Sequence, residues 1–403
     1  MNDSLSRREP SVIAQSRNAT PGGGRNRGEK RTGGTAARPG TISGVQGPTR
    51  IAYAGRIHAP MGVVAATSAV ALMFAATPFL ISPIAERYGV SEGAVGLISV
   101  AQVGAFAAAN FIMPRLLDPR GGILRLAAAA LVALNLLSIV PTVYGVLVGI
   151  RLLAGFAAGS MTWLAWTDAM QQRTSMSAVA AAGPLTVLIG APILSVVAES
   201  GDRAVYLLLA LVAVPAVLIY APISGERRRS GAVSRSRSNR FLMAAMWMLT
   251  FFGSALFINQ ALVARDIHGL TSLSASIAFS LNAAGGLLGA RLSSRHRHPG
   301  WFLASAGIAA WASVNGPSAL FFIGMAWWGF AFWMGVPGVM EMISARSLER
   351  SERAGDTQGL MAVGRALGPA MGGVFVDAGA LVALSFVSGV GLFTAGATVI
   401  GVK

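Results

Sequence analysis

Two arginines, Arg151 and Arg365, lie inside long apolar stretches of this sequence. A cation in an apolar environment is costly, so it normally faces a water-filled cavity or a polar partner. Arg151 lies about two helical turns inside its stretch, which favours a position facing a cavity. The alternative is an arginine near the end of its helix whose side chain extends to the polar interface.

Other polar and aromatic side chains inside apolar stretches are candidates for contacts with a bound small molecule. They are Asn110, Thr162, Trp163 and Trp166 in the first half of the chain and Asn259, Gln260, Asn282, Trp327 and Trp328 in the second. Tryptophan is also typical of the aromatic belts at membrane surfaces, and for each tryptophan this alternative stays open.

The sequence lacks the residues that several kinds of chemistry require. It has no cysteine, which excludes disulfides, thiolate catalysis and cysteine-based metal sites. Its four histidines lie outside the apolar stretches, and no aspartate or glutamate lies near the middle of one. No nucleotide-binding glycine loop is present. We therefore expect no metal, no cofactor and no enzymatic activity.

The composition identifies the surroundings of these residues. Charged residues make up 12% of the chain and hydrophobic residues 54%, and the mean hydropathy is +0.60. Soluble proteins carry about a quarter of their residues as charged side chains, so a bilayer must cover this apolar surface. A helix crosses the hydrocarbon core with about 20 residues. Twelve such stretches follow one another, near 59–83, 93–113, 122–141, 143–166, 176–199, 204–222, 241–264, 271–290, 300–314, 317–343, 357–376 and 380–400.

The basic residues indicate how these twelve spans are oriented. One side of the predicted bundle carries the basic N-terminal tail and loop residues Arg115, Arg120, Arg125, Arg173, Arg291, Arg295, Arg297, Arg346, Arg350 and Arg353, with the basic segment 227–240. The other side carries only Arg87, Arg203 and Arg265. Basic loops stay in the cytoplasm, so both termini are expected there. The net charge of +16 thus reflects membrane topology, and no nucleic-acid partner is expected.

The spans divide the chain into four parts. Residues 1–58 are predicted to form a disordered basic cytoplasmic tail, because they are too polar to bury a core. An alternative is that translation begins at Met61. A six-helix half at 59–223, a basic linker at 224–240 and a second six-helix half at 241–403 follow. The predicted fold is an all-α membrane protein with twelve transmembrane helices in two pseudo-symmetric halves. This organisation resembles the major facilitator superfamily.

A loop between the second and third spans strengthens the resemblance. The family pattern there is similar to G-x-x-x-D-R-x-G-R-R, and this chain has Asp118, Arg120 and Gly121 in the stretch that begins at Pro114. The leading glycine is replaced by Pro114, and the arginines are displaced. The resemblance implies a charge latch that stabilises one orientation of the halves. The alternative is a turn whose arginines only set topology.

Two further patterns lie inside spans. Arg151 and Gly155 resemble the family's R-x-x-x-G motif, whose arginine the resemblance links to proton transfer or substrate contact. The eleventh span is similar to the antiporter-associated pattern G-x8-G-x3-G-P-x2-G-G, through Gly355, Gly364, Gly368, Pro369, Gly372 and Gly373, with Arg365 in the same stretch. Simple helix packing would also account for these glycines.

The resemblance implies a monomeric transporter in the cytoplasmic (inner) membrane that works by alternating access. It is similar to bacterial drug and sugar efflux permeases, which implies export of a small molecule in exchange for protons. Because no acid lies within a span's middle, coupling would join Arg151 with a peripheral acid such as Glu86 or Asp168. The alternatives are a uniporter or importer of a neutral metabolite, and a membrane receptor or scaffold without flux.

Overall fold

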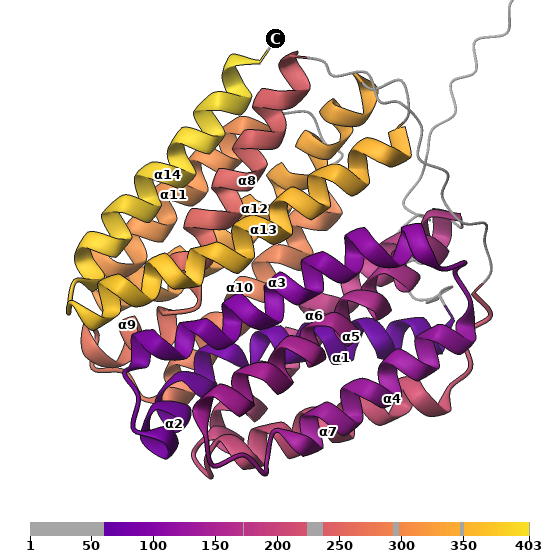
Figure 1. Ribbon diagram of the computed structural model, residues 1–403. Coiled ribbons are helices and arrows are strands. Elements are labelled where there is room, and N and C mark those ends of the chain that lie inside the picture. The colour runs from indigo at the N-terminus through magenta and orange to yellow at the C-terminus, as the bar shows by residue number, and fades with distance from the viewer. Residues whose placement is uncertain (1–59, 172, 224–236, 293–297, 347–349, 403) are drawn as a thin grey trace, which may run out of the picture. The chain divides into compact units, whose positions relative to one another are not determined.

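The computed structural model describes residues 60–402 except 172, 224–236, 293–297 and 347–349, and its regular elements are α-helices (Figure 1). A helix satisfies its own backbone hydrogen bonds, which a chain inside a bilayer requires. The predicted tail at 1–58 and most of the predicted linker at 224–240 lie outside the described residues, so these boundaries remain predictions.

The helices fall into two sets on either side of the segment 224–236. The first set is α1 (Met61–Ala75), α2 (Thr77–Tyr88), α3 (Glu92–Leu116), α4 (Gly121–Leu137), α5 (Tyr144–Gln171), α6 (Arg173–Ala198) and α7 (Asp202–Leu218). The second set is α8 (Arg237–Phe257), α9 (Gln260–Asp266), α10 (Ser272–Leu292), α11 (Pro299–Asn315), α12 (Ser318–Ala345), α13 (Arg350–Asp377) and α14 (Leu381–Gly401).

These helices make the twelve predicted spans. Among the described residues, eight spans are long and apolar enough to cross a membrane, and the bent pair of α1 and α2 makes nine. The remaining three are α4, α7 and α11, each with 17 residues, which is near the shortest length that crosses the hydrocarbon core. The shortest predicted stretch, at 300–314, corresponds to the helix α11.

The first span of each half is interrupted. α1 and α2 meet at Ala76 with a bend of 52°, and Pro78 lies in the first turn of α2, where its missing N–H costs nothing. In the second half, α8 ends at Phe257 and α9 begins at Gln260. The sequence predicted a single continuous helix at both places. Asn259, in the second break, lines a pocket that residues of both halves surround.

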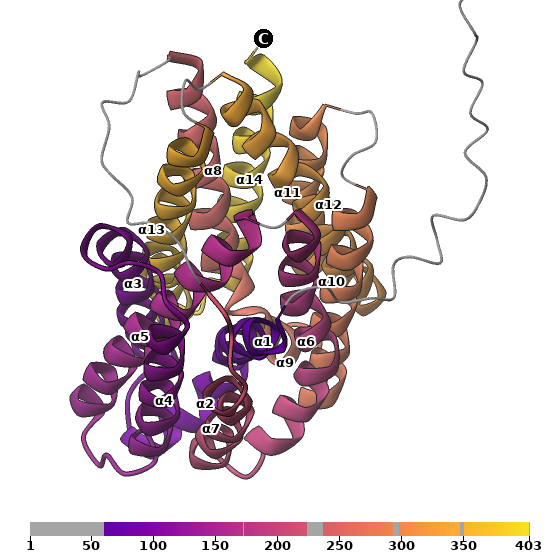
Figure 2. The same ribbon diagram turned by 90° about the vertical axis from the view of Figure 1, so that its right-hand side faces the viewer.

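The two halves meet along two helix pairs. α3 lies along α13, and α6 lies along α10 (Figure 1 and Figure 2). The helices of the first pair lie so close together that a Cβ atom added at Gly93 would overlap the backbone of Gly373. We call the end of the bundle with the turns 89–91, 267–271 and 378–380 the far face. The opposite end, where α1 begins and α14 ends, is the tail face.

Candidate functional site

Arg151 lies at the centre of a buried polar cluster in the first half. Its side chain is 1% exposed. Nε and Nη2 donate to Oε1 of Gln102 at 2.9 and 2.7 Å, and Nη1 donates to Oδ1 of Asn135 at 2.7 Å and to Oγ of Ser138 at 3.4 Å. The ring of Tyr206 lies 5.1 Å from the guanidinium carbon. The side chain therefore does not extend to the membrane interface.

The cluster joins four helices through neutral partners. Gln102 belongs to α3, Asn135 and the capping residue Ser138 to α4, and Tyr206 to α7. Within the described part of the chain, none of the groups bonded to Arg151 is a carboxylate. A buried cation without a counter-charge is stable only if hydrogen bonds satisfy its donors. The amide and hydroxyl oxygens around Arg151 supply those bonds.

Gly155 explains how Arg151 reaches Gln102. It lies one turn after Arg151 on α5, and a Cβ atom there would overlap the backbone oxygen of Gln102. The glycine therefore lets α5 lie directly against α3 at this level. The spacing R-x-x-x-G thus has a packing reason in this chain.

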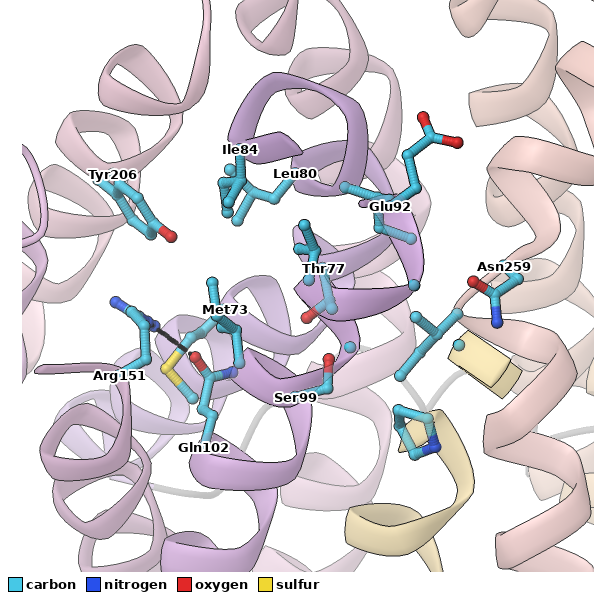
Figure 3. Close-up of a pocket in the computed structure, with 18 residues that line it drawn as sticks. Met73, Thr77, Leu80, Ile84, Glu92, Ser99, Gln102, Arg151, Tyr206 and Asn259 are labelled. Atoms are coloured by element: carbon cyan, nitrogen blue, oxygen red, sulfur yellow. Dashed lines mark hydrogen bonds between the residues drawn. The ribbon is translucent and has the colours of Figure 1, made fainter. Parts of the chain in front are cut away.

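A pocket runs from Arg151 toward the boundary between the halves (Figure 3). Its first-half lining includes Thr77, Ser99, Gln102 and Tyr206, and its second-half lining includes Ile258, Asn259, Pro369 and Gly373. Figure 3 shows the hydroxyl groups of Thr77 and Ser99 turned toward the middle of this space. Apolar side chains such as Met73 and Leu80 form much of the remaining wall. Residues from both halves therefore surround one space.

At the far face of the bundle, a polar network bridges the two halves. We call it the far-face clasp, and it consists of Ser82, Glu92, Arg265 and Asp266. Arg265 of α9 donates from both terminal nitrogens to the Glu92 carboxylate of α3, at 2.9 Å each. It also donates to Ser82 of α2 and to its neighbour Asp266. Glu92 is thereby held by a cation from the other half.

A second link between the halves lies beside the clasp. Asp377, the last residue of α13, accepts hydrogen bonds from the Ser91 hydroxyl at 3.1 Å and from the Gly93 backbone N–H at 3.0 Å. The carboxylate lies at the N-terminus of α3, where the helix dipole favours a negative charge. Among the described residues, one ion pair joins the two halves, Arg265 with Glu92, and it lies at this face.

Asp168 is a buried acid at the other end of α5. Its side chain is 2% exposed, and Oδ2 has no hydrogen-bond partner among the described residues. It follows Arg151 by 17 residues on one continuous helix, a separation of about 25 Å. Burying a carboxylate without a partner is unfavourable, and binding a proton removes its charge.

Comparisons with known proteins decide the family. The family model of the major facilitator superfamily matches residues 63–373, more than half of the chain. The chain belongs to the major facilitator superfamily. It is therefore a membrane transporter rather than an enzyme, and the superfamily fold moves its solutes by alternating access.

Solved transporter structures share the superfamily fold. One is a bacterial homologue of the human lysosomal transporter Spinster, in an inward-facing and occupied conformation, with a TM-score of 0.69, 14% identity and coverage of 84% of this chain and 95% of that one. Another is the human organic anion transporter MFSD10 (TETRAN), with a TM-score of 0.58, 16% identity and coverage of 84% and 97%. No curated protein matches this chain in sequence.

The superfamily loop motif lies on the tail face. The Asp118 carboxylate lies 3.5 Å from Arg120, and both side chains are largely exposed. Gly121 begins α4 and lies against the backbone oxygen of Ala221. In the described residues, these side chains form no bond to the second half, so the predicted latch stays a prediction.

The glycine motif of α13 packs against two helices. Gly364, Gly368 and Gly372 face α8, and a Cβ atom at any of them would overlap its side chains and backbone. Pro369 and Gly373 face α3 at Gly96 and Gly93, and both line the pocket. Arg365 is half-buried on the same helix. Helix packing thus accounts for Gly364, Gly368, Gly372 and Gly373 without reference to antiport.

The predicted substrate contacts are spread over the molecule. Asn259 lines the pocket, and its amide donates to the backbone oxygen of Ala255. Gln260 is fully buried and donates to Ser313, while Asn282 donates to the backbone oxygen of Met325. Trp328 is buried edge-on against Phe257. Of these, the structure brings only Asn259 to the pocket near Arg151.

The remaining predicted contacts lie away from this pocket. Asn110 donates to the oxygen of Phe106 on its own helix. Trp163 is buried on α5, and Thr162 and Trp166 are half-buried there. Trp327 is 45% exposed and donates to Ser305, as expected of a residue on the outer surface of the bundle. Whether any of them contacts substrate stays a prediction.

Sequence reasoning missed the partners of Arg151 and the far-face clasp. Gln102, Asn135 and Tyr206 are polar residues inside apolar stretches, which is the criterion that selected Asn110. Applied to every span, it would have found them. The clasp gave no such signal, because Glu92 and Arg265 are separated by 173 positions and lie at helix ends.

Proposed function

We propose that this chain is a monomeric exporter that moves a small organic molecule out of the cytoplasm in exchange for protons. It lies in the cytoplasmic membrane with both termini, and so the tail face, in the cytoplasm. The distribution of basic loop residues supports this orientation, since such loops stay in the cytoplasm.

One observation carries the proposal: a single pocket is lined by both halves beneath a polar network that joins them at the far face. A transporter of this kind exposes its central site to one side at a time, as its halves rock around it. With the far face held together, the site is loaded from the tail face. That order of events suits export.

Asp168 supports coupling to protons. It is a buried carboxyl group on the same helix as Arg151, and its Oδ2 has no hydrogen-bond partner among the described residues. A helix that moves with the transport cycle changes the exposure of such a group. The group then binds a proton in one state and releases it in the other.

The neutral partners of Arg151 favour a second candidate, a facilitator that moves its substrate without protons. As far as the structure describes the chain, the hydrogen bonds of Arg151 run to amide and hydroxyl oxygens, and none runs to an acid. In that case Asp168 would only be a buried structural group. The two candidates differ in their dependence on a pH gradient.

Inverted membrane vesicles, acidified inside by respiration and containing a pH-sensitive dye, test the proposal with a panel of drugs, sugars and organic acids. An exported compound should dissipate the gradient, and Asp168→Asn should abolish this while the protein remains inserted. The matched control is Glu199→Gln, an exposed acid at the far face, which should leave the response unchanged.

Uptake of labelled compounds that ignores the gradient and survives Asp168→Asn would reject antiport in favour of the facilitator. Complete absence of protein-dependent flux for the panel would reject the export proposal and favour a receptor or scaffold.

A further inference from the structure

Arg151 fixes the orientation of two amide groups. It binds the side-chain oxygens of Gln102 and Asn135, so the NH2 group of each amide must point elsewhere. The NH2 group of Asn135 is buried and has no hydrogen-bond partner among the described residues. Gln102 lines the pocket, 3% exposed, and Figure 3 shows its nitrogen directed away from Arg151. The cation thus leaves unused donors around itself.

Two hydroxyl groups on the same pocket wall are also unpartnered. Ser99 is 2% exposed and Tyr206 fully buried, and neither hydroxyl has a hydrogen-bond partner among the described residues. Both residues line the pocket with Arg151. Figure 3 places the Tyr206 hydroxyl on the side of the ring that faces the pocket. Buried polar groups of this kind normally have a partner, so their pocket should hold one.

Two acids near the pocket are paired with other arginines, so they do not neutralise the positive charge of Arg151. Asp202, one turn before Tyr206, is bound to Arg87 at 2.7 Å. Glu92 lines the pocket, but the far-face clasp holds its carboxylate, and Figure 3 shows it turned away from Arg151. The Arg151 end of the pocket therefore combines one free positive charge with an excess of donors.

We propose that the Arg151 end of the pocket is a binding site for a small anionic group. The group is either the carboxylate of the transported molecule or a free inorganic anion such as chloride. An acceptor with a negative charge fits this wall, because N–H and O–H groups of Arg151, Gln102, Ser99 and Tyr206 surround it and hydrogen bonds to charged groups are the strong ones. The inference rests on the proposed function for the substrate's role, but the site itself binds without flux.

The first measurement is binding to the purified full-length chain in nanodiscs, read as a shift of its melting temperature and by calorimetry. Sodium benzoate and sodium lactate are compared with benzamide and lactamide, which match their shapes without the charge. Sodium chloride is compared with an uncharged osmolyte. Anions should raise the melting temperature and their neutral counterparts should not.

Ser99→Ala and Tyr206→Phe test whether the bound anion lies at this wall. Each removes one hydroxyl that has no hydrogen-bond partner in the described part of the chain, so neither breaks a hydrogen bond described there. Each should weaken anion binding about tenfold, since each removes one hydrogen bond to a charged group. The matched controls are Ser195→Ala, buried elsewhere on α6, and Tyr144→Phe, whose hydroxyl donates to Ala94. Both should bind anions as the parent chain does.

The pattern among the anions identifies the source of the group. Tighter binding of the carboxylates than of chloride assigns the site to the substrate's acid group, and the reverse assigns it to a free inorganic anion. Equal binding of anions and neutral amides overturns the proposal, as does unchanged anion binding in both hydroxyl variants. Export of neutral or cationic compounds with no anion binding would sink this inference while leaving the proposed function standing.

Discussion

At the scale of single residues, the stability of the molecule depends on how Arg151 is bonded. Its two bonds to Gln102 Oε1 satisfy donors on a side chain that is 1% exposed. Gln102→Leu removes this acceptor, and we expect a loss of about 3 kcal/mol. A lower apparent melting temperature in detergent would report it. Asn110→Leu is the control on the same helix: within the described part of the chain, its side chain bonds to the backbone oxygen of Phe106, and the change should cost less than about 1 kcal/mol.

A double variant separates this bond from general packing. Arg151→Met with Gln102→Leu removes the guanidinium together with the acceptor of two of its bonds, so no buried cation is left with unsatisfied N–H groups, although Asn135 and Ser138 lose their bonds to Arg151. The double variant should therefore melt at a higher temperature than Gln102→Leu alone. Additive losses from the two single changes would contradict a direct interaction.

The sequence could predict that Arg151 lies at a site, but not which residues satisfy it. The cost of a cation inside a span is a property of the residue, and it is independent of the fold. The identity of its partners depends on how α3, α4, α5 and α7 pack. Gly155 shows the difference: its contact with Gln102 follows from that packing, although its spacing from Arg151 is visible in the chain.

At the scale of helices, α13 illustrates how small residues set close approach. A Cβ atom at Gly368 would overlap the backbone oxygen of Phe251 on α8, which cannot move without shifting that helix. We expect Gly368→Ala to destabilise the protein by about 1–3 kcal/mol. Gly149→Ala is the matched control, because Gly149 is exposed on α5 and its Cβ would meet nothing within 4 Å. Thermal denaturation should show Gly149→Ala to be neutral or stabilising.

The twelve spans were predictable because each must cover the hydrocarbon core with apolar side chains. The interruptions at Ala76 and at 258–259 were not, because each lies inside a long apolar stretch, and the polar residues Asn259 and Gln260 were interpreted as substrate contacts on a continuous helix. Pro78 marked the first break only weakly, since proline is also tolerated within membrane helices. Both breaks occur in the first span of a half, and this repetition becomes visible only once the two halves are compared in the structure.

At the scale of the whole molecule, the far-face clasp favours one arrangement of the halves. It joins α3 to α9, while Asp377 joins α13 to the start of α3. Asp377 directly follows the predicted span 357–376, but its bond across the halves could not be predicted from the sequence. A state in which the far-face ends of the halves separate would break this pairing. Because the sequence must be compatible with both states, no sequence pattern marks the pairing between the halves.

Removing the clasp should open the far face more often. Arg265 is 48% exposed and Glu92 26%, so solvent screens the pair and we expect it to contribute about 1 kcal/mol. Glu92→Gln should therefore raise the population with separated far-face ends about fivefold. The chain has no native cysteine, so cysteines placed at Thr142 and Ala378 carry spin labels at chosen sites only, and pulsed electron resonance gives the distance distribution. Glu86→Gln, an exposed acid on α2, is the matched control. A distribution unchanged by Glu92→Gln, or changed equally by Glu86→Gln, would show that the clasp does not hold the far face closed.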